Sequence, residues 1–170
     1  MKKIILLFLA VTMIAVVGCK DACKNVNCLN GGTCADGTCN CAEYYEGTNC
    51  ENAWNVKFAG DWVGTIEGII DPITCTITAA DKPNLINFNA DINIVLPSMT
   101  LSLPISGENF VLTTTNTFTI PQMPVEIEGF EGLEVIGNGS LVNGTLTVTI
   151  TPLLNGTSIG MNYVFVGTKQ

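Results

Sequence analysis

Six cysteines fall within residues 23–50, and this density constrains the fold more than any other feature of the 170-residue chain. Their spacing is C-x4-C-x5-C-x4-C-x-C-x8-C, and a segment this short cannot bury enough apolar surface to fold without cross-links. Zinc binding is the rival use of such a cluster, but zinc sites usually contain C-x2-C pairs, and this segment has none. The spacing therefore predicts three disulfides and no metal site, while leaving many connectivities open.

Three motifs in this segment resemble an epidermal growth factor (EGF)-like module, which would span residues 23–51. They are Asn30-Gly31-Gly32-Thr33-Cys34, then Cys39-x-Cys41, then Tyr45-x-Gly47-x2-Cys50. The resemblance implies that the first cysteine pairs with the third, the second with the fourth and the fifth with the sixth. Carried over, the bridges are Cys23–Cys34, Cys28–Cys39 and Cys41–Cys50. Some members of that family bind calcium through an acidic cluster before the first cysteine, but only Asp21 stands there, so we expect no calcium.

The N-terminus has the pattern of a targeting segment. Two lysines follow Met1, and residues 4–17 are apolar apart from Thr12. This run is shorter than the ~20 residues that a spanning helix needs, and it fits the apolar region of a secretory signal peptide. A short buried helix is the alternative, but such a helix would show a polar stripe. We expect residues 1–18 to be a signal peptide.

The residues Val16-Val17-Gly18-Cys19 resemble the lipobox of bacterial lipoproteins. That resemblance implies a diacylglycerol on the Cys19 thiol, cleavage before Cys19, and an acyl chain such as palmitate on its amine, so residues 19–22 would form a lipidated N-terminus. The alternative is an ordinary secreted protein, but the six-cysteine frame leaves Cys19 without a partner. Lys20 resembles the outer-membrane class of these lipoproteins, and Lys20-Asp21 resembles a surface-export signal. Membrane attachment through this lipid is therefore expected at the outer membrane, and the resemblance to the surface-export signal implies exposure on its outer face.

The charge and composition of the chain exclude several functions. The formal net charge is -8, which argues against a nucleic-acid partner. Arginine and histidine are absent, so Ser–His and Cys–His catalytic pairs cannot form. Cys75 remains outside the disulfide frame, and we expect a free thiol acting as a small apolar side chain. Two pairs of acidic residues, Glu126 with Glu128 and Glu131 with Glu134, are interpreted as a solvated loop and not as catalytic carboxylates. No catalytic residue and no cofactor besides the covalent lipid is expected.

Residues 52–170 alternate between apolar and polar side chains and show no helical period, which predicts an all-β domain. Asn143-Gly144 and Asn155-Gly156 are hairpin signals. Neighbouring strands that turn back on themselves predict an antiparallel up-and-down barrel, with a β-sandwich as the alternative. The expected strands are 61–70, 73–80, 84–96, 99–106, 109–120, 124–128, 133–142 and 145–151, with 158–168 as a ninth.

Gly60-Asp61-Trp62 at the start of the first strand resembles the Gly-x-Trp motif of lipocalins and other calycin barrels. In that family the tryptophan plugs the closed end of the barrel. The arginine that packs over this tryptophan in lipocalins is absent here. The chain is more similar to the small calycin-like barrels of lipoproteins from Bacteroidetes-type bacteria.

An eight-stranded barrel has room inside for side chains or for one small ligand. The side chains expected to point inward are Trp62, Ile66, Phe88, Ile92, Ile94, Leu103, Phe110, Leu112, Leu146, Val148, Met161, Tyr163 and Phe165. A filled interior favours a non-enzymatic interaction module that binds a protein or glycan. A cavity would favour a carrier of a small neutral apolar ligand, because no arginine or histidine is present to pair with a carboxylate. An enzyme inhibitor that presents its loops is a third alternative.

Overall fold

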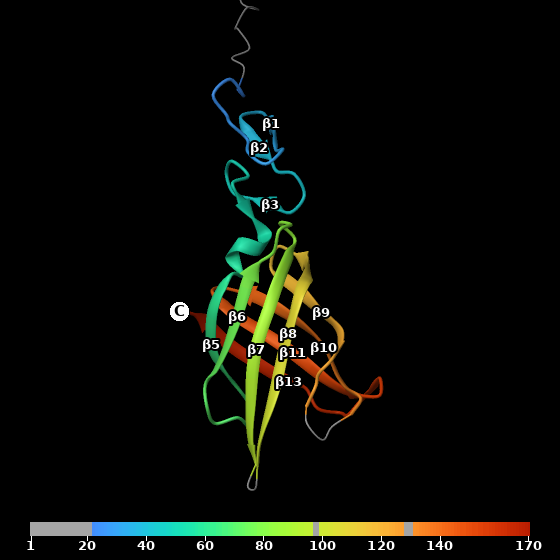
Figure 1. The fold of residues 1–170 in the computed structure, drawn as a ribbon. Coiled ribbons are helices and arrows are strands. Elements are labelled where there is room, and N and C mark those ends of the chain that lie inside the picture. The colour runs from blue at the N-terminus through green and yellow to red at the C-terminus, as the bar shows by residue number, and fades with distance from the viewer. Residues whose placement is uncertain (1–21, 97–98, 128–130) are drawn as a thin grey trace, which may run out of the picture.

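The computed structural model describes residues 22–96, 99–127 and 131–170, with the side chains of these residues except 94–101. The predicted signal peptide, Cys19 and Glu128 lie outside the described residues. The described chain is nearly all strand, and its helical element is the short 3-10 helix η1 (Trp54–Lys57). Figure 1 shows a small disulfide-rich segment at one end of the molecule and a barrel at the other. We call residues 22–53 the N-terminal module, and the barrel end away from it the distal end.

Two short hairpins and three disulfides build the N-terminal module. The strand β1 (Thr33–Ala35) pairs with β2 (Thr38–Asn40), and β3 (Tyr45–Glu46) pairs with β4 (Asn52–Ala53). The disulfides are Cys23–Cys34, Cys28–Cys39 and Cys41–Cys50, so the pairing expected from the sequence is confirmed. Cys50 is fully buried, and a side chain at Gly32 would come within 2.8 Å of its sulfur. The bridges therefore take the place of an apolar core in this module.

Eight strands form a closed antiparallel barrel, which confirms the predicted all-β fold and decides for the barrel over the sandwich. Consecutive strands pair, β10 pairs with β11, and β13 returns to β5, so the sheet has no free edge. The two-residue strand β12 (Thr157–Ser158) extends only the end of β11. The eight barrel strands are β5 (Gly60–Ile66), β6 (Ile73–Ala79), β7 (Leu85–Leu96), β8 (Met99–Thr114), β9 (Thr117–Pro124), β10 (Leu133–Val142), β11 (Thr145–Leu154) and β13 (Tyr163–Lys169).

The predicted strand boundaries are wrong in the middle of the chain. The break between the strands expected at 99–106 and 109–120 is misplaced, because β8 runs unbroken through Gly107 and Asn109 to Thr114 and the next strand, β9, begins only at Thr117. Asn109 has a φ of 60° and its backbone N–H donates to the Asn87 side chain at 3.0 Å, next to an irregularity in the β7–β8 register. The residues between the two expected strands therefore form a bulge within β8 and not a turn. The strand expected at 124–128 is also absent, because β9 ends at Pro124 and residues 125–127 are outside the regular strands.

The end of the barrel nearest the N-terminal module is closed by η1 and the residues after it. Phe58 is fully buried and packs edge-on against Phe118 of β9, with ring centroids 5.6 Å apart. The Trp62 indole N–H donates to the Phe58 carbonyl at 2.8 Å. Lys169 lies over the Trp62 ring, with its Nζ 5.9 Å from the ring centroid. Gly60 has a φ of 142° and leaves space for the Lys169 side chain, which explains a glycine two residues before the tryptophan.

Candidate functional site

The barrel interior is filled by its own side chains. The predicted inward residues Trp62, Ile66, Phe88, Ile92, Leu103, Phe110, Leu112, Leu146, Val148 and Phe165 are all buried, and Tyr163 is half-buried against them. The ten buried side chains are between 0% and 5% exposed. Side chains that line a ligand-sized cavity would retain far more accessible surface. In the part of the barrel whose side chains are described, the interior is therefore a packed core. Ile94 is outside that part.

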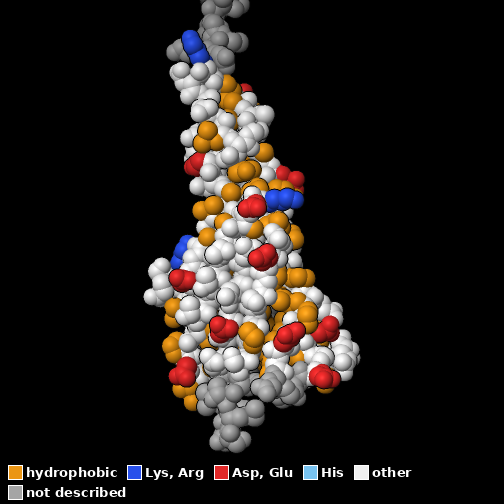
Figure 2. Space-filling view, viewed as in Figure 1, with side chains coloured by type: hydrophobic (Ala, Val, Ile, Leu, Met, Phe, Trp, Pro, Cys, Tyr) orange, Lys and Arg blue, Asp and Glu red, His pale blue; other side chains and the backbone are white. Residues whose placement is uncertain are grey.

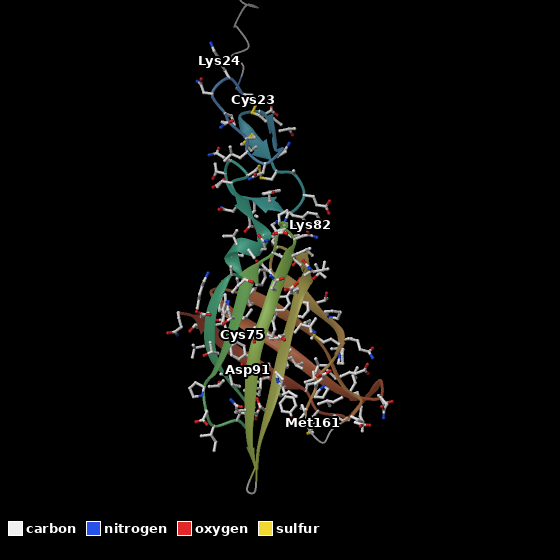
Figure 3. All side chains as sticks on the ribbon, viewed as in Figure 1. Cys23, Lys24, Cys75, Lys82, Asp91 and Met161 are labelled. Atoms are coloured by element: carbon white, nitrogen blue, oxygen red, sulfur yellow. A yellow bond between two sulfur atoms is a disulfide. The ribbon has the colours of Figure 1, made fainter. Side chains whose placement is uncertain are left out.

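One predicted inward residue is wrong, and several inward residues were missed. Met161 is 54% exposed because β13 begins only at Tyr163, so Met161 precedes the strand whose alternation was extended to it. Figure 3 shows Met161 toward the distal end. Except for Phe58, which follows η1, the missed residues occupy inward positions of the barrel strands, and the alternation could have identified them. The missed residues include Phe58, Ile77, Ile86, Ile105, Phe118, Ile120, Val135 and Ile150, each no more than 2% exposed.

Cys75 is a free thiol buried in the barrel wall, as expected. Figure 3 shows it on β6. Burial, and secondarily the nearby Asp61 carboxylate, raises the pKa of the Cys75 thiol from 9.0 to about 12. A raised pKa favours the folded state while the thiol is protonated, so this contribution is present below pH 9.0 and is lost as pH rises toward about 12. A protonated, inaccessible thiol is not a nucleophile at neutral pH.

One hollow lies near the distal end of the barrel, and we call it the distal hollow. Its volume is about 830 Å³. Three separate stretches of chain meet there: the end of β9, the β9–β10 connection and the turn after β11. The lining residues are Gln122, Pro124, Val125, Glu126, Ile127, Glu131, Gly132, Leu133, Glu134, Asn155 and Gly156.

Backbone hydrogen bonds hold these three stretches together. The Val125 N–H donates to the Leu133 carbonyl, and the Asn155 N–H donates to the Gly132 carbonyl, both at 2.9 Å. Asn155 and Gly156 have φ values of 50° and 78°, so the predicted Asn-Gly turn is confirmed. These bonds bring the turn after β11 against the start of β10 and give the distal hollow a defined shape.

The distal hollow has an apolar floor and a polar rim. Val125 is buried, and Ile127 and Leu133 are half-buried. On the rim, Gln122 Nε2 donates to Glu134 Oε2 at 2.9 Å, while Glu126 and Glu131 are exposed. The rim therefore presents solvated carboxylates and an amide above the apolar floor.

A second recessed surface is a polar trough on the outer side of β6, β7 and β8. Two hollows of about 380 and 420 Å³ share Thr76 and Asn89 there. Their walls are mainly hydroxyl, amide and carboxylate side chains, and Thr76 Oγ1 donates to Asp61 Oδ1 at 2.8 Å. Figure 3 labels Asp91 in this region. The trough offers hydrogen-bonding groups, and its lining also includes the apolar side chains of Pro72, Ile73 and Phe88.

No protein-family model, curated protein or solved structure matches the chain. Within residues 22–96, 99–127 and 131–170, no helix has the length and hydropathy to cross a bilayer. The same residues contain no cluster of three His, Cys, Asp or Glu side chains that could hold a metal ion.

An apolar floor with a hydrogen-bonding rim is the arrangement with which proteins commonly bind peptides and small molecules. The distal hollow has this arrangement, and at about 830 Å³ it is larger than either hollow of the polar trough. The sequence indicated the acidic residues of the rim but not the hollow, because its lining joins residues 122–134 to Asn155 and Gly156, farther along the chain. We take the distal hollow as the candidate functional site.

Proposed function

We propose that this protein is a lipoprotein of the bacterial cell envelope, anchored at the outer membrane through Cys19. Its EGF-like module, residues 23–51, carries a barrel, residues 52–170, which binds a protein or glycan partner on its outer surface. The role is non-enzymatic. The observation that carries the proposal is the packed interior, because a barrel without room inside must bind its partner outside.

Export from the cytoplasm is supported by the N-terminal pattern and by the disulfides. Three bridges within residues 23–50 are typical of oxidising compartments such as the bacterial periplasm or the cell surface. In Figure 1 the N-terminal module lies at one end of the barrel, opposite the distal end. An anchor at Cys19 would therefore hold the barrel away from the membrane, with the distal hollow on the far end.

Contacts between the N-terminal module and the barrel support this role as a spacer. Lys57 of η1 pairs with Glu46 of the module at 2.9 Å, and its Nζ also donates to Asn116 Oδ1, in the β8–β9 turn, at 3.0 Å. The Trp54 backbone N–H donates to the Tyr44 carbonyl at 3.0 Å, and the two aromatic rings meet edge-on. A junction with this many contacts orients the barrel better than a free linker would.

Replacing Cys19 with serine should abolish incorporation of a labelled fatty acid into the protein, because the lipid is attached through the thiol. The measurement is acyl labelling in a bacterial host, followed by capture of this chain. A chain whose residues 1–19 are replaced by an ordinary cleavable secretory signal should be released from membranes. Cys75→Ser is the matched control, since that thiol is buried, and it should keep both the label and the membrane location. Label that persists in Cys19→Ser would overturn the anchor.

Binding at the distal hollow can be tested with a photo-crosslinking amino acid at Glu126, in cells that express the full chain. A specific adduct is expected from Glu126 and not from Glu43, an exposed glutamate of the N-terminal module. Protease and periodate treatment then distinguish a protein adduct from a glycan adduct. Equal adducts at both positions, or none, would contradict the proposal. An apolar small molecule that co-purifies in native mass spectrometry would instead support the carrier alternative.

A further inference from the structure

One side of the barrel carries no charge. Residues 135–168 contain no Asp, Glu, Lys or Arg, whereas 13% of the whole chain is charged. A stretch of this length would carry about four charged residues at that frequency, and soluble proteins normally spread charge over their whole surface. The stretch includes nearly all of β10, all of β11 and most of β13, which are neighbours in the barrel.

The outward side chains of these strands form a continuous grid, which we call the neutral face. The register places Ser140 beside Thr147 and Thr147 beside Val166, and the neighbouring rows follow the same pattern. Val166 in turn lies beside Thr65 of β5, but β5 also carries the exposed Asp61, so the uncharged rows end at β13. The neutral face consists of Ile136, Asn138, Ser140, Val142, Thr145, Thr147, Thr149, Thr151, Val164, Val166 and Thr168.

The other side of the barrel is different. In the view of Figure 1, β6, β7 and β8 lie in front. Figure 2, drawn from the same side, shows acidic side chains spread over this face. Outward positions there include Asp91 of β7 and Glu108 of β8, both exposed. The negative charge of the barrel is thus concentrated away from the neutral face.

The side chains of the neutral face suit it to burial. Most are threonine, valine or isoleucine, whose branched Cβ atoms restrict χ1, so ordering them in a contact costs little conformational entropy. Val142 and Val166 are 58% and 46% exposed, which leaves apolar surface in contact with water. Charged residues are depleted at the centres of protein interfaces, and here they are missing altogether.

We infer that the neutral face is the contact surface between two copies of this chain. A net charge of -8 makes two copies repel one another, and the neutral face is where they can approach without burying or juxtaposing carboxylates. Closure of the barrel removes strand edges, so association must use a face of the sheet and not edge-to-edge pairing. A two-fold axis through the neutral face would place the same patch of each copy against the other.

The size of the neutral face implies a weak dimer. Three strands about 4.8 Å apart and four rows about 6.8 Å apart cover roughly 400 Å². A stable interface buries about 800 Å² on each partner, so free chains would associate only at high concentration. Anchoring in one membrane, which rests on the proposed function, would raise the effective concentration and favour pairing. A two-fold axis along the length of the barrel would keep both N-termini at the same membrane.

Chemical cross-linking of the full chain in bacterial cells tests this inference. Thr147→Cys places a thiol at the centre of the neutral face, and a short bismaleimide should link two copies into a species of twice the mass. Asn89→Cys, on the opposite side of the barrel, and the parent chain should give none. Adding Val166→Lys to the Thr147→Cys chain should reduce the linked fraction about fivefold or more, because like charges then face each other. Thr74→Lys on β6 adds the same charge elsewhere and should leave it unchanged.

The cross-link is measured separately in membrane and soluble fractions, so that a failed anchor and a failed dimer give different results. If the protein is soluble but Thr147→Cys still links copies, only the anchor is wrong. Absence of the dimer, equal linking from Asn89→Cys, or linking to a different protein would overturn the self-association. Circular dichroism of each purified variant confirms that the exposed substitution has not unfolded the barrel.

Discussion

Trp62→Ala should destabilise the barrel by about 3–5 kcal/mol, the usual loss when a buried tryptophan is truncated. Trp62 is 1% exposed, donates to the Phe58 carbonyl and lies beneath Lys169, so its removal opens a cavity at the closed end of the barrel. A domain of this size is typically stable by only about 5–15 kcal/mol. Denaturant unfolding followed by far-UV circular dichroism measures the change, with all variants in the same detergent.

Trp62→Phe separates packing from hydrogen bonding. It keeps an aromatic ring but leaves the Phe58 carbonyl without the indole N–H, so we expect a smaller loss of about 1–3 kcal/mol. Thr65→Ala, at an exposed position of the same strand, is the control and should cost less than about 1 kcal/mol. If Trp62→Ala cost no more than Thr65→Ala, the tryptophan would not be closing the barrel.

The disulfide frame and the barrel could be predicted because each follows from a local pattern. The motifs around Cys34, Cys41 and Cys50 pointed to the observed pairing. Alternation such as that from Ile86 to Ile92 follows the pleat of a strand, which puts every second side chain inside. The same logic failed at Met161, where the alternation continued past the point at which the strand begins.

Other features depend on contacts between distant residues and leave little trace in the sequence. Asn109 resembles a turn residue, and only its hydrogen bond to Asn87 on the neighbouring strand shows that it forms a bulge. The sequence lacks the arginine expected over Trp62, but Lys169, more than 100 residues away, occupies that position. The distal hollow likewise joins residues near 122–134 to the turn at Asn155. Such sites become visible only when strand order and register are known.

Cys41→Ala combined with Cys50→Ala should unfold the second half of the N-terminal module and leave the barrel folded. The bridge closes a loop with a sequence separation of 9, and restricting the unfolded chain to this extent contributes about 2–3 kcal/mol. Cys50 is fully buried, so the double substitution also removes part of the small core beneath Gly32. Limited proteolysis should then cut residues 41–53 rapidly, while far-UV circular dichroism retains the signal of the barrel.

Removing Cys23–Cys34 by the same double alanine substitution is the matched control, because that bridge lies farther from the barrel along the chain. It should expose the start of the module to protease and spare residues 41–53, since Cys41–Cys50 and the β3–β4 pairing remain. Only loss of Cys41–Cys50 should disturb Glu46, and with it the Lys57 contact that joins module and barrel. That pair is partly exposed and adds little stability, so the barrel should unfold at nearly the same denaturant concentration in both variants. A large shift of barrel unfolding in either variant would mean that the module and the barrel fold as one cooperative unit.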